Sequence, residues 1–298
     1  YTATMNTSTT AIKVEIGCEI EDWNNPDGGD SGEDEEGGDD SGDSGDDTVY
    51  TDLSAAGTAN CYLVQQAGDY KFKAVIGNTD ATVGNVKTVE VLWESFGTDE
   101  MPDVGDLIAA ASYKDGYICF STPEAFRDGN AVIAAKNSKG TILWSWHIWC
   151  AEEGWTEQVY YNDAGTMMDR NLGATSATPG DVGALGLLYQ WGRKDPFLGS
   201  SSISSSVMAV STGAWNITSG GSVVNAEENP MAFYTGMSLP NGSWQTVKTV
   251  CDPCPTGWRV PEGGNEGVWA KALGTDSSAN LTYDSANRGI DCSALFGD

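Results

Sequence analysis

The chain has 298 residues, of which 43 are Asp or Glu and 15 are Lys or Arg, so its formal net charge is −28. That charge excludes proteins that hold nucleic acid or an anionic membrane surface through basic residues, because both partners repel an acidic chain. Hydrophobic residues make up 40% of the sequence, which is enough for sizeable cores, and no apolar run approaches the roughly 18 residues of a membrane-spanning helix.

Residues 1–26 contain an alternating segment in which Ile12, Val14 and Ile16 are separated by Lys13 and Glu15. Alternation of apolar and polar residues is typical of a half-buried strand. Because 26 residues cannot form a domain, we expect the terminal strands of a β domain that begins earlier in a longer chain.

Residues 27–47 consist only of 11 acidic residues, seven glycines and three serines. This segment has no apolar side chain to bury, so nothing offsets the entropy lost on ordering. We expect an extended, disordered acidic linker. It lacks the ligand spacing of an EF-hand calcium loop.

Residues 48–155 contain short runs rich in β-branched and aromatic residues, separated by turn signals. Asp115-Gly116 indicates a two-residue hairpin, and residues 137–140 indicate a second one. Five to seven strands at this spacing predict a β-sandwich.

Residues 156–298 differ from the preceding part in composition, because they contain long stretches rich in Ser, Thr and Gly that predict loops. Short helices are expected at residues 184–191 and 267–274, and a loop is expected at residues 200–222. The fold class is therefore mostly β, with an α+β part at the C-terminal end.

Candidate catalytic chemistry is sparse. His147 is the only histidine, it lies among tryptophans in a predicted strand, and a single histidine excludes a multi-histidine metal site. One Cys-x-x-Cys pair, Cys251 and Cys254, is weak support for zinc, and a disulfide between one of them and a distant cysteine is the favoured alternative. The sequence predicts no catalytic residue, no metal site and no cofactor.

Three segments, "MMDRNLGAT", "LLYQWGRKDPF" and "DPCPTGWRVP", resemble the Fibrobacter succinogenes major paralogous domain family of Bacteroidales surface proteins. The resemblance implies a C-type-lectin-like module at residues 156–298. Family members continue beyond the point where this sequence stops, so we expect the module to be incomplete. Residues 11–24 resemble, more weakly, the closing strand of a fimbrillin-like pilin domain.

Two Trp-x-Arg or Trp-Arg units lie in these segments, and they have two interpretations. Trp191, Arg193 and Asp195 form one unit, and Trp258 and Arg259 repeat the chemistry. A guanidinium can stack on an indole while it binds a carboxylate, so an internal structural role is favoured, with ligand contact as the alternative.

The carboxylates expected beside the two arginines are Asp195 and Asp252. Cys254 matches the position that the family resemblance pairs with a terminal cysteine. Because that cysteine is absent from this sequence, we expect Cys254 to be free.

The resemblance implies a protein at the cell surface or at a pilus tip. We expect non-catalytic adhesion to a glycan or a host surface protein, with other pilus subunits as further partners. The alternative is a secreted glycan-active enzyme or its accessory domain.

Overall fold

The computed structural model describes residues 48–198, 209–235, 244–263 and 267–273, and the backbone of four short strands outside these ranges. The expected mostly-β class is confirmed, and the strands form several sheets. In chain order the strands are β1 Lys13–Glu15, β2 Glu19–Ile20, β3 Thr51–Asp52, β4 Cys61–Val64, β5 Asp69–Lys73, β6 Thr88–Ser95, β7 Ala110–Lys114, β8 Tyr117–Ser121, β9 Gly129–Lys136, β10 Ile142–Cys150, β11 Glu157–Tyr160, β12 Gly165–Met168, β13 Leu188–Gln190, β14 Pro196–Phe197, β15 Val210–Ser211, β16 Asn216–Ser219, β17 Ala232–Thr235, β18 Trp258–Arg259, β19 Tyr283–Asp284 and β20 Gly289–Ile290. The helices are the 3₁₀ turn η1 Val182–Leu185, α1 Val223–Glu228 and α2 Val268–Leu273.

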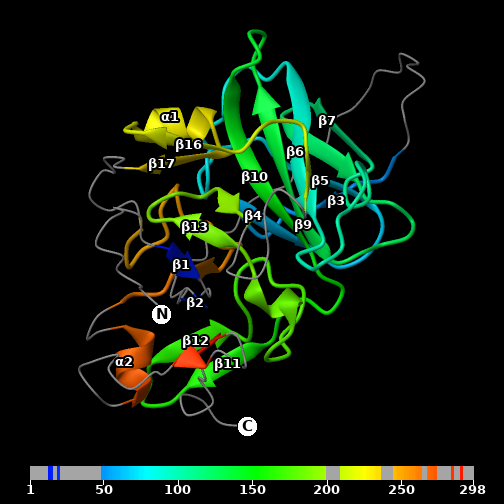
Figure 1. Ribbon diagram of the computed structural model, residues 1–298. Helices are drawn as coiled ribbons and strands as arrows, with labels where there is room; N and C mark the ends of the chain where they lie inside the picture. The colour runs from blue at the N-terminus through cyan, green and yellow to red at the C-terminus, as the bar shows by residue number, and fades with distance from the viewer. Residues whose placement is uncertain are drawn as a thin grey trace, which may run out of the picture.

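A five-stranded sheet in the order β15-β6-β9-β10-β4 forms the centre of the molecule (Figure 1). Strands β9 and β10 are buried along nearly their whole length, on both faces. Their sequences, "GNAVIAAK" and "ILWSWHIWC", are accordingly almost continuous in apolar residues, as expected for strands covered on two sides.

One face of this sheet packs against a four-stranded sheet in the order β3-β5-β8-β7. The cluster between them includes Phe72, Phe120 and Trp146, and the Phe72 and Trp146 rings meet edge-on with centroids 5.2 Å apart. Aromatic pairs prefer this arrangement to a face-to-face stack.

The opposite face packs against the C-terminal half of the chain. Trp149 on β10 stacks on Trp155 at 5.4 Å, and Trp155 meets Trp258 on β18 edge-on at 5.9 Å. A second hydrophobic cluster therefore joins the central sheet directly to the C-terminal strands.

Both predicted hairpins are present. Asp115 and Gly116 join β7 to β8 with φ angles of 51° and 85°, the positive values that a two-residue turn requires. Between β9 and β10 the Asn137 side chain accepts hydrogen bonds from the backbone N–H groups of Lys139 and Thr141. Residues 48–155 hold eight strands, β3 to β10, rather than five to seven.

The strands of the N-terminal segment pair with the C-terminal half. Strand β1 runs antiparallel to β13, and β2 lies between β12 and β18 in the sheet β11-β12-β2-β18. The acidic segment 27–47 lies outside the described residues, and the proposed domain boundaries stay predictions.

The predicted helices are only partly correct. Helix α2 confirms the second one, but η1 is a single 3₁₀ turn and residues 188–190 form β13, so the expected helix at 184–191 is wrong. The Leu-rich run there is short and ambiguous, and tertiary pairing with β1 and β14 decides in favour of a strand. In the expected loop at 200–222, residues 210–211 and 216–219 are strands.

A buried carboxylate fixes the loop between β6 and β7. Glu94 is 1% exposed, and its side chain accepts hydrogen bonds from the backbone N–H groups of Gly105, Leu107 and Ile108 at 2.7, 3.0 and 2.7 Å. Three backbone donors that would otherwise be buried without a partner are thereby satisfied.

Replacing Glu94 with Ala should lower the free energy of unfolding by about 2–4 kcal/mol, because it leaves these donors unpaired. Denaturant titration measures the change, and Glu124→Ala, at an exposed position, is the matched control and should change stability by less than about 0.5 kcal/mol. Equal stability of the two variants would contradict this role.

Candidate functional site

A tight turn after β13 places an aromatic side chain at the surface. The backbone N–H of Arg193 donates to the carbonyl of Gln190 at 3.0 Å, and Gly192 takes a φ of 75°. Glycine adopts this positive φ at the third position of a turn without the clash that a Cβ would cause. Trp191, at the corner of the turn, is 48% exposed.

The base of the turn is fixed to β17 by a side-chain amide. Gln190 accepts a hydrogen bond from the Tyr234 N–H at 3.2 Å and donates to the Tyr234 carbonyl. It also accepts from Arg193 at 3.1 Å. The amide of Gln190 therefore replaces a backbone partner for β17.

Arg193 is buried and is surrounded by oxygen acceptors. Its guanidinium donates to the carbonyls of Ala226 and Ala232 at 3.1 and 2.6 Å and contacts Asp195 at 3.5 Å. The Ala226 carbonyl belongs to the last turn of α1, where a cation is favoured by the unpaired carbonyls and the helix dipole. Burial lowers the pKa of the guanidinium, and the Asp195 charge opposes that change.

Lys194 and Asp195 lie beneath the turn, against β10. The Lys194 ammonium donates to Asp195 and to the Ser145 hydroxyl, both at 2.6 Å, and to the Ser145 carbonyl at 3.0 Å. The Ser145 hydroxyl in turn donates to Asp195 at 2.6 Å. All three side chains are buried, so the pair is an internal link between β10 and the segment after β13.

This arrangement does not support serine chemistry. A serine–lysine nucleophile needs a neutral lysine that accepts the hydroxyl proton, whereas the Ser145 hydroxyl is directed to a carboxylate and Lys194 donates to it. Ser145 is also only 1% exposed, so a substrate has no access to its oxygen.

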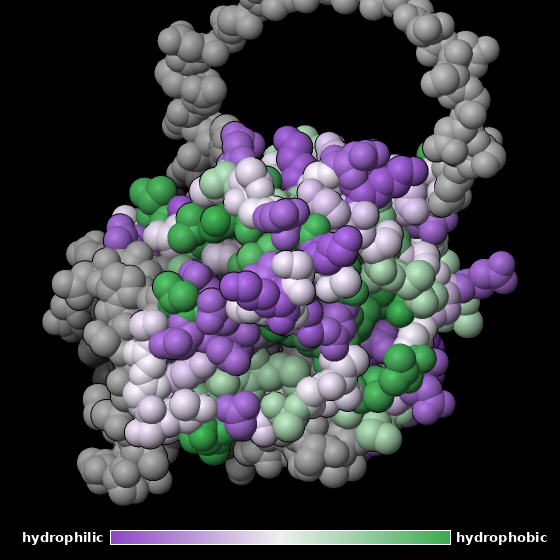
Figure 2. Space-filling model, turned by 90° about the horizontal axis from the view of Figure 1, so that it is seen from above, coloured by the Kyte–Doolittle hydropathy of each residue, from purple (hydrophilic) through white to green (hydrophobic). Residues whose placement is uncertain are grey.

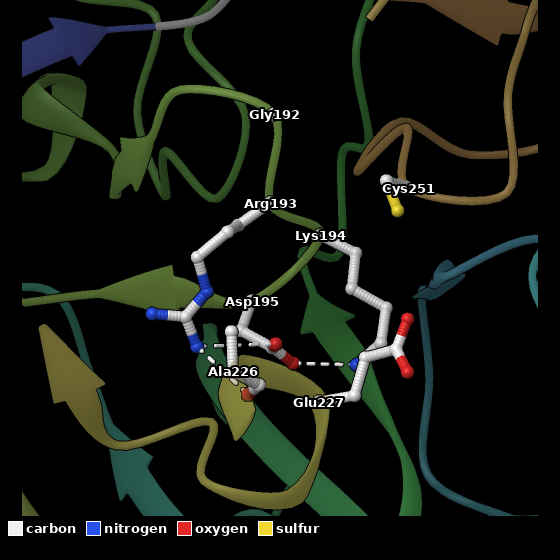
Figure 3. A pocket seen from close by; sticks show the side chains of 7 residues that line it. All are labelled: Gly192, Arg193, Lys194, Asp195, Ala226, Glu227 and Cys251. Atoms are coloured by element: carbon white, nitrogen blue, oxygen red, sulfur yellow. Dashed lines mark hydrogen bonds and ion pairs between the residues drawn. The ribbon is translucent and has the colours of Figure 1, made fainter. Parts of the chain in front are cut away.

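A small pocket opens beside this cluster (Figure 3), lined by Gly192, Arg193, Lys194, Asp195, Ala226, Glu227 and Cys251. It is close in size to the space of one water molecule. Burial raises the pKa of the Glu227 carboxyl, with Lys194 acting in the opposite direction. Burial, followed by the Glu227 charge, raises the pKa of the Cys251 thiol to about 11, which makes it a poor nucleophile at neutral pH.

A second tryptophan, Trp244, packs against the exposed Trp191 ring. The Trp191 and Trp244 rings meet at 63° with centroids 5.0 Å apart, and Trp244 is nearly buried. The Trp244 indole donates to the Cys251 carbonyl at 2.9 Å, so the platform continues to the rim of the pocket. Val247 and Val250, in the segment after Trp244, are exposed as well.

A buried ion pair organises the "DPCPTGWRVP" segment. Lys248 donates to Asp252 at 2.7 Å and to the carbonyls of Cys254 and Trp258 at 2.8 Å. Asp252 also accepts from the backbone N–H groups of Cys254 and Val260, both at 2.9 Å. The pair satisfies four backbone polar groups of one loop.

The proposed structural residues have a mixed outcome. Trp258 is buried in the core, but the expected pairing of Arg259 with Asp252 is wrong, because Asp252 is bound by Lys248. Arg259 is half-buried and donates to the Val260 carbonyl at 3.2 Å.

The expectation of a free Cys254 is also wrong. Cys254 is disulfide-bonded, and Cys251 carries a free thiol, so the two do not pair with each other. The earlier inference of a disulfide with another cysteine is therefore correct for Cys254.

The residues Trp191, Arg193 and Asp195 separate into two roles. Arg193 and Asp195 are buried together, whereas Trp191 turns outward, and Arg193 lies over the Phe197 and Tyr234 rings instead, at 5.2 and 5.6 Å. The sequence reasoning missed Lys194, Ser145 and Glu227. Only the charge of Lys194 between Arg193 and Asp195 could have signalled its role, because Ser145 and Glu227 approach through tertiary packing.

His147 is a buried, neutral side chain. Its Nε2 contacts the Asn130 side-chain oxygen at 2.9 Å, and the Asn130 amide group donates to the Gly173 carbonyl at 2.8 Å. The Asn130 oxygen is an acceptor, so we assign the proton to Nε2, which leaves Nδ1 as a buried acceptor without a partner. Burial lowers the pKa of His147 from 6.5 to about 3.

Within the ranges that the structure describes, no group of three or more His, Cys, Asp or Glu side chains could hold a metal ion. In the same ranges no helix is long and apolar enough to cross a membrane. Comparison with known protein families, with curated proteins and with solved structures finds no match to this chain.

Arg193→Ala should lower the free energy of unfolding by about 3 kcal/mol or more, because it removes the cation from buried acceptors that then have no partner. The matched control is Lys139→Ala, in the exposed turn between β9 and β10, with an effect below about 0.5 kcal/mol. Chemical denaturation measures both. An Arg193 variant as stable as the control would contradict the structural role.

His147 should make stability depend on pH. Its pKa is lowered in the folded protein, so unfolding takes up a proton below pH 6.5, and stability falls by about 1.4 kcal/mol per pH unit from there towards pH 3. The measurement is the difference in unfolding free energy between the wild type and His147→Gln from pH 7 to pH 4. A constant difference would show that His147 does not titrate in this way.

Proposed function

We propose that the protein is a non-catalytic, adhesin-like binding module of a cell surface or a pilus tip, and that its ligand is a glycan. The observation that supports this most is the exposed Trp191 platform. An indole that is half-exposed at the surface is suited to stacking on the C–H face of a sugar ring.

The platform is preorganised. Trp244 packs against one side of the Trp191 ring. Trp191 lies in a turn that Gln190 and Arg193 attach to β17 and α1 by hydrogen bonds. A binding residue whose conformation is already set loses less entropy when the ligand arrives. The buried hydrogen bonds beneath the turn therefore favour a binding role for Trp191, because they fix its position before a ligand arrives.

The charge of the chain limits the class of glycan. With a net charge of −28, the protein repels sulfated or sialylated sugars at long range, so a neutral glycan is the better ligand. Single-site binding through one aromatic platform is expected to be weak, and display of many copies on a surface or fibre would raise the avidity.

A broad apolar docking surface is not the basis of the proposal. Figure 2, which looks onto the end of the molecule that carries α1, shows hydrophobic residues in small groups among hydrophilic ones. Adhesion through a few specific side chains fits this surface better than adhesion through a large hydrophobic patch.

Trp191→Ala should reduce binding to a neutral-glycan array at least tenfold, with little change in thermal stability, because the ring is at the surface and its loss leaves no buried cavity. The matched control is Tyr113→Ala, an exposed aromatic residue on the edge strand β7, which should bind like the wild type. Undiminished binding by the Trp191 variant would overturn the site.

A panel of glycosidase, esterase and peptidase substrates tests the enzyme alternative on the same preparation. We expect no turnover. Turnover that survives repurification and is lost on substitution of one carboxylate or serine would show that the adhesin proposal is wrong.

A further inference from the structure

Residues 244–251 form a closed surface loop beside the Trp191 platform. The loop begins at Trp244, whose ring contacts the Trp191 ring. The Trp244 indole donates to the Cys251 carbonyl at 2.9 Å, so the two ends of the loop lie side by side. Compact surface loops with adjacent ends are frequently functional.

Two asparagines from the first half of the chain fix the backbone of this loop. The Asn78 side chain donates to the Lys248 carbonyl at 3.2 Å, and the Asn60 side chain donates to the Val250 carbonyl at 2.8 Å. The buried Lys248 ammonium holds the same loop from the inside through its ion pair with Asp252. The loop is therefore fixed at its ends and in its middle, so it loses little entropy when a ligand binds to it.

The outer surface of the loop carries no charge. Lys248 is the only charged residue within 244–251, and it is buried. The exposed residues are Gln245, Thr246, Val247 and Val250. Val247 is 70% exposed, so an apolar side chain stands in water directly after an amide and a hydroxyl side chain.

We propose that this loop is a second subsite of the glycan-binding site, and that it takes the acetamido group of an N-acetylated hexosamine. The inference rests on the proposed function, in which the sugar ring stacks on Trp191. An acetamido group combines a methyl group with an amide. The loop supplies the matching set, because Val247 offers methyl groups, and Gln245 and Thr246 offer hydrogen-bond donors and acceptors.

The two subsites are close enough for one short oligosaccharide. The ring centroids of Trp191 and Trp244 are 5.0 Å apart. Val247 follows Trp244 by three residues, so their Cα atoms are at most about 11 Å apart. A sugar on the Trp191 ring, or its immediate neighbour in the glycan, can therefore present its acetamido group to the loop.

Charge and polarity favour this substituent over the other common ones. A sulfate or a carboxylate is repelled by a chain of net charge −28, whereas an acetamido group is neutral. A hydroxyl in its place would leave the Val247 methyl groups without an apolar contact. We therefore expect the loop to discriminate between an acetamido group and a hydroxyl by about tenfold, which is the usual scale for one small apolar contact.

Chitotriose and cellotriose are the matched pair of ligands for the test. They differ only at C2 of each ring, where the first carries an acetamido group and the second a hydroxyl. Titration calorimetry on the full-length chain should find that chitotriose binds about tenfold more tightly than cellotriose.

Substitutions in the loop test which residues cause the difference. Val247→Ser should weaken chitotriose binding about five- to tenfold and leave cellotriose binding unchanged, because only the acetyl contact is lost. Gln245→Ala should weaken chitotriose binding in the same selective way. Val49→Ser makes the same change at a position that is 89% exposed beside β3, and it should bind both ligands like the wild type. All three positions are exposed, so the thermal midpoint should stay the same.

The possible results separate this inference from the proposed function. Equal affinity for the two ligands, with binding that Trp191→Ala abolishes, would overturn the acetamido subsite and leave the proposed function standing. A preference for chitotriose that Val247→Ser and Gln245→Ala do not reduce would also overturn the subsite. Binding of neither ligand, together with no binding to a neutral-glycan array that depends on Trp191, would overturn both.

Discussion

The five-stranded sheet is buried on both faces, and the rest of the structure depends on that constraint. Strands β9 and β10 have almost no exposed side chain on either face, so most of the polar groups that they carry need a protein partner. Ser145 finds Lys194 and Asp195, and His147 finds Asn130. These contacts join the central sheet to the C-terminal half by specific geometry, where hydrophobic packing alone would allow sliding.

In the loops, buried cations join neighbouring segments by hydrogen bonds. Arg193 donates hydrogen bonds to the end of α1 and to the start of β17. Lys248 donates to carbonyls in the loop before β18 and in β18 itself. A charged group in a low-dielectric interior is costly unless nearly every hydrogen-bond position is used, and both side chains are enclosed by carbonyls and one carboxylate. These loops have little regular structure, and the hydrogen bonds of Arg193 and Lys248 to backbone carbonyls hold them in place where a β-sheet would use backbone hydrogen bonds.

Local features of the fold could be predicted from the sequence, and distant ones could not. Asp115-Gly116 fixes its own turn through backbone conformation, and the apolar run of β9 and β10 indicates deep burial. The strand at 188–190 is ambiguous, because a short apolar run suits a helix as well as a strand. Residue types alone singled out the segment with Trp191 and Arg193, but they did not separate the exposed indole from the buried guanidinium. The partner of Asp252 was assigned wrongly, because Arg259 was favoured as the arginine of the same Trp-Arg segment. In the structure Asp252 binds Lys248, four residues before it.

The position of β2 has a consequence for synthesis. Ile20 leaves the ribosome before its partner Trp258, which follows 238 residues later. At about 5–20 residues per second the strand waits on the order of 10–50 s before its groove exists. During that time its sequence must resist other strands, and the charges of Lys13, Glu15 and Glu19 are the kind that protect an exposed edge. This strand is thus made long before the strand that it pairs with, and its solubility in that interval is as much a requirement on this sequence as its fit in the sheet.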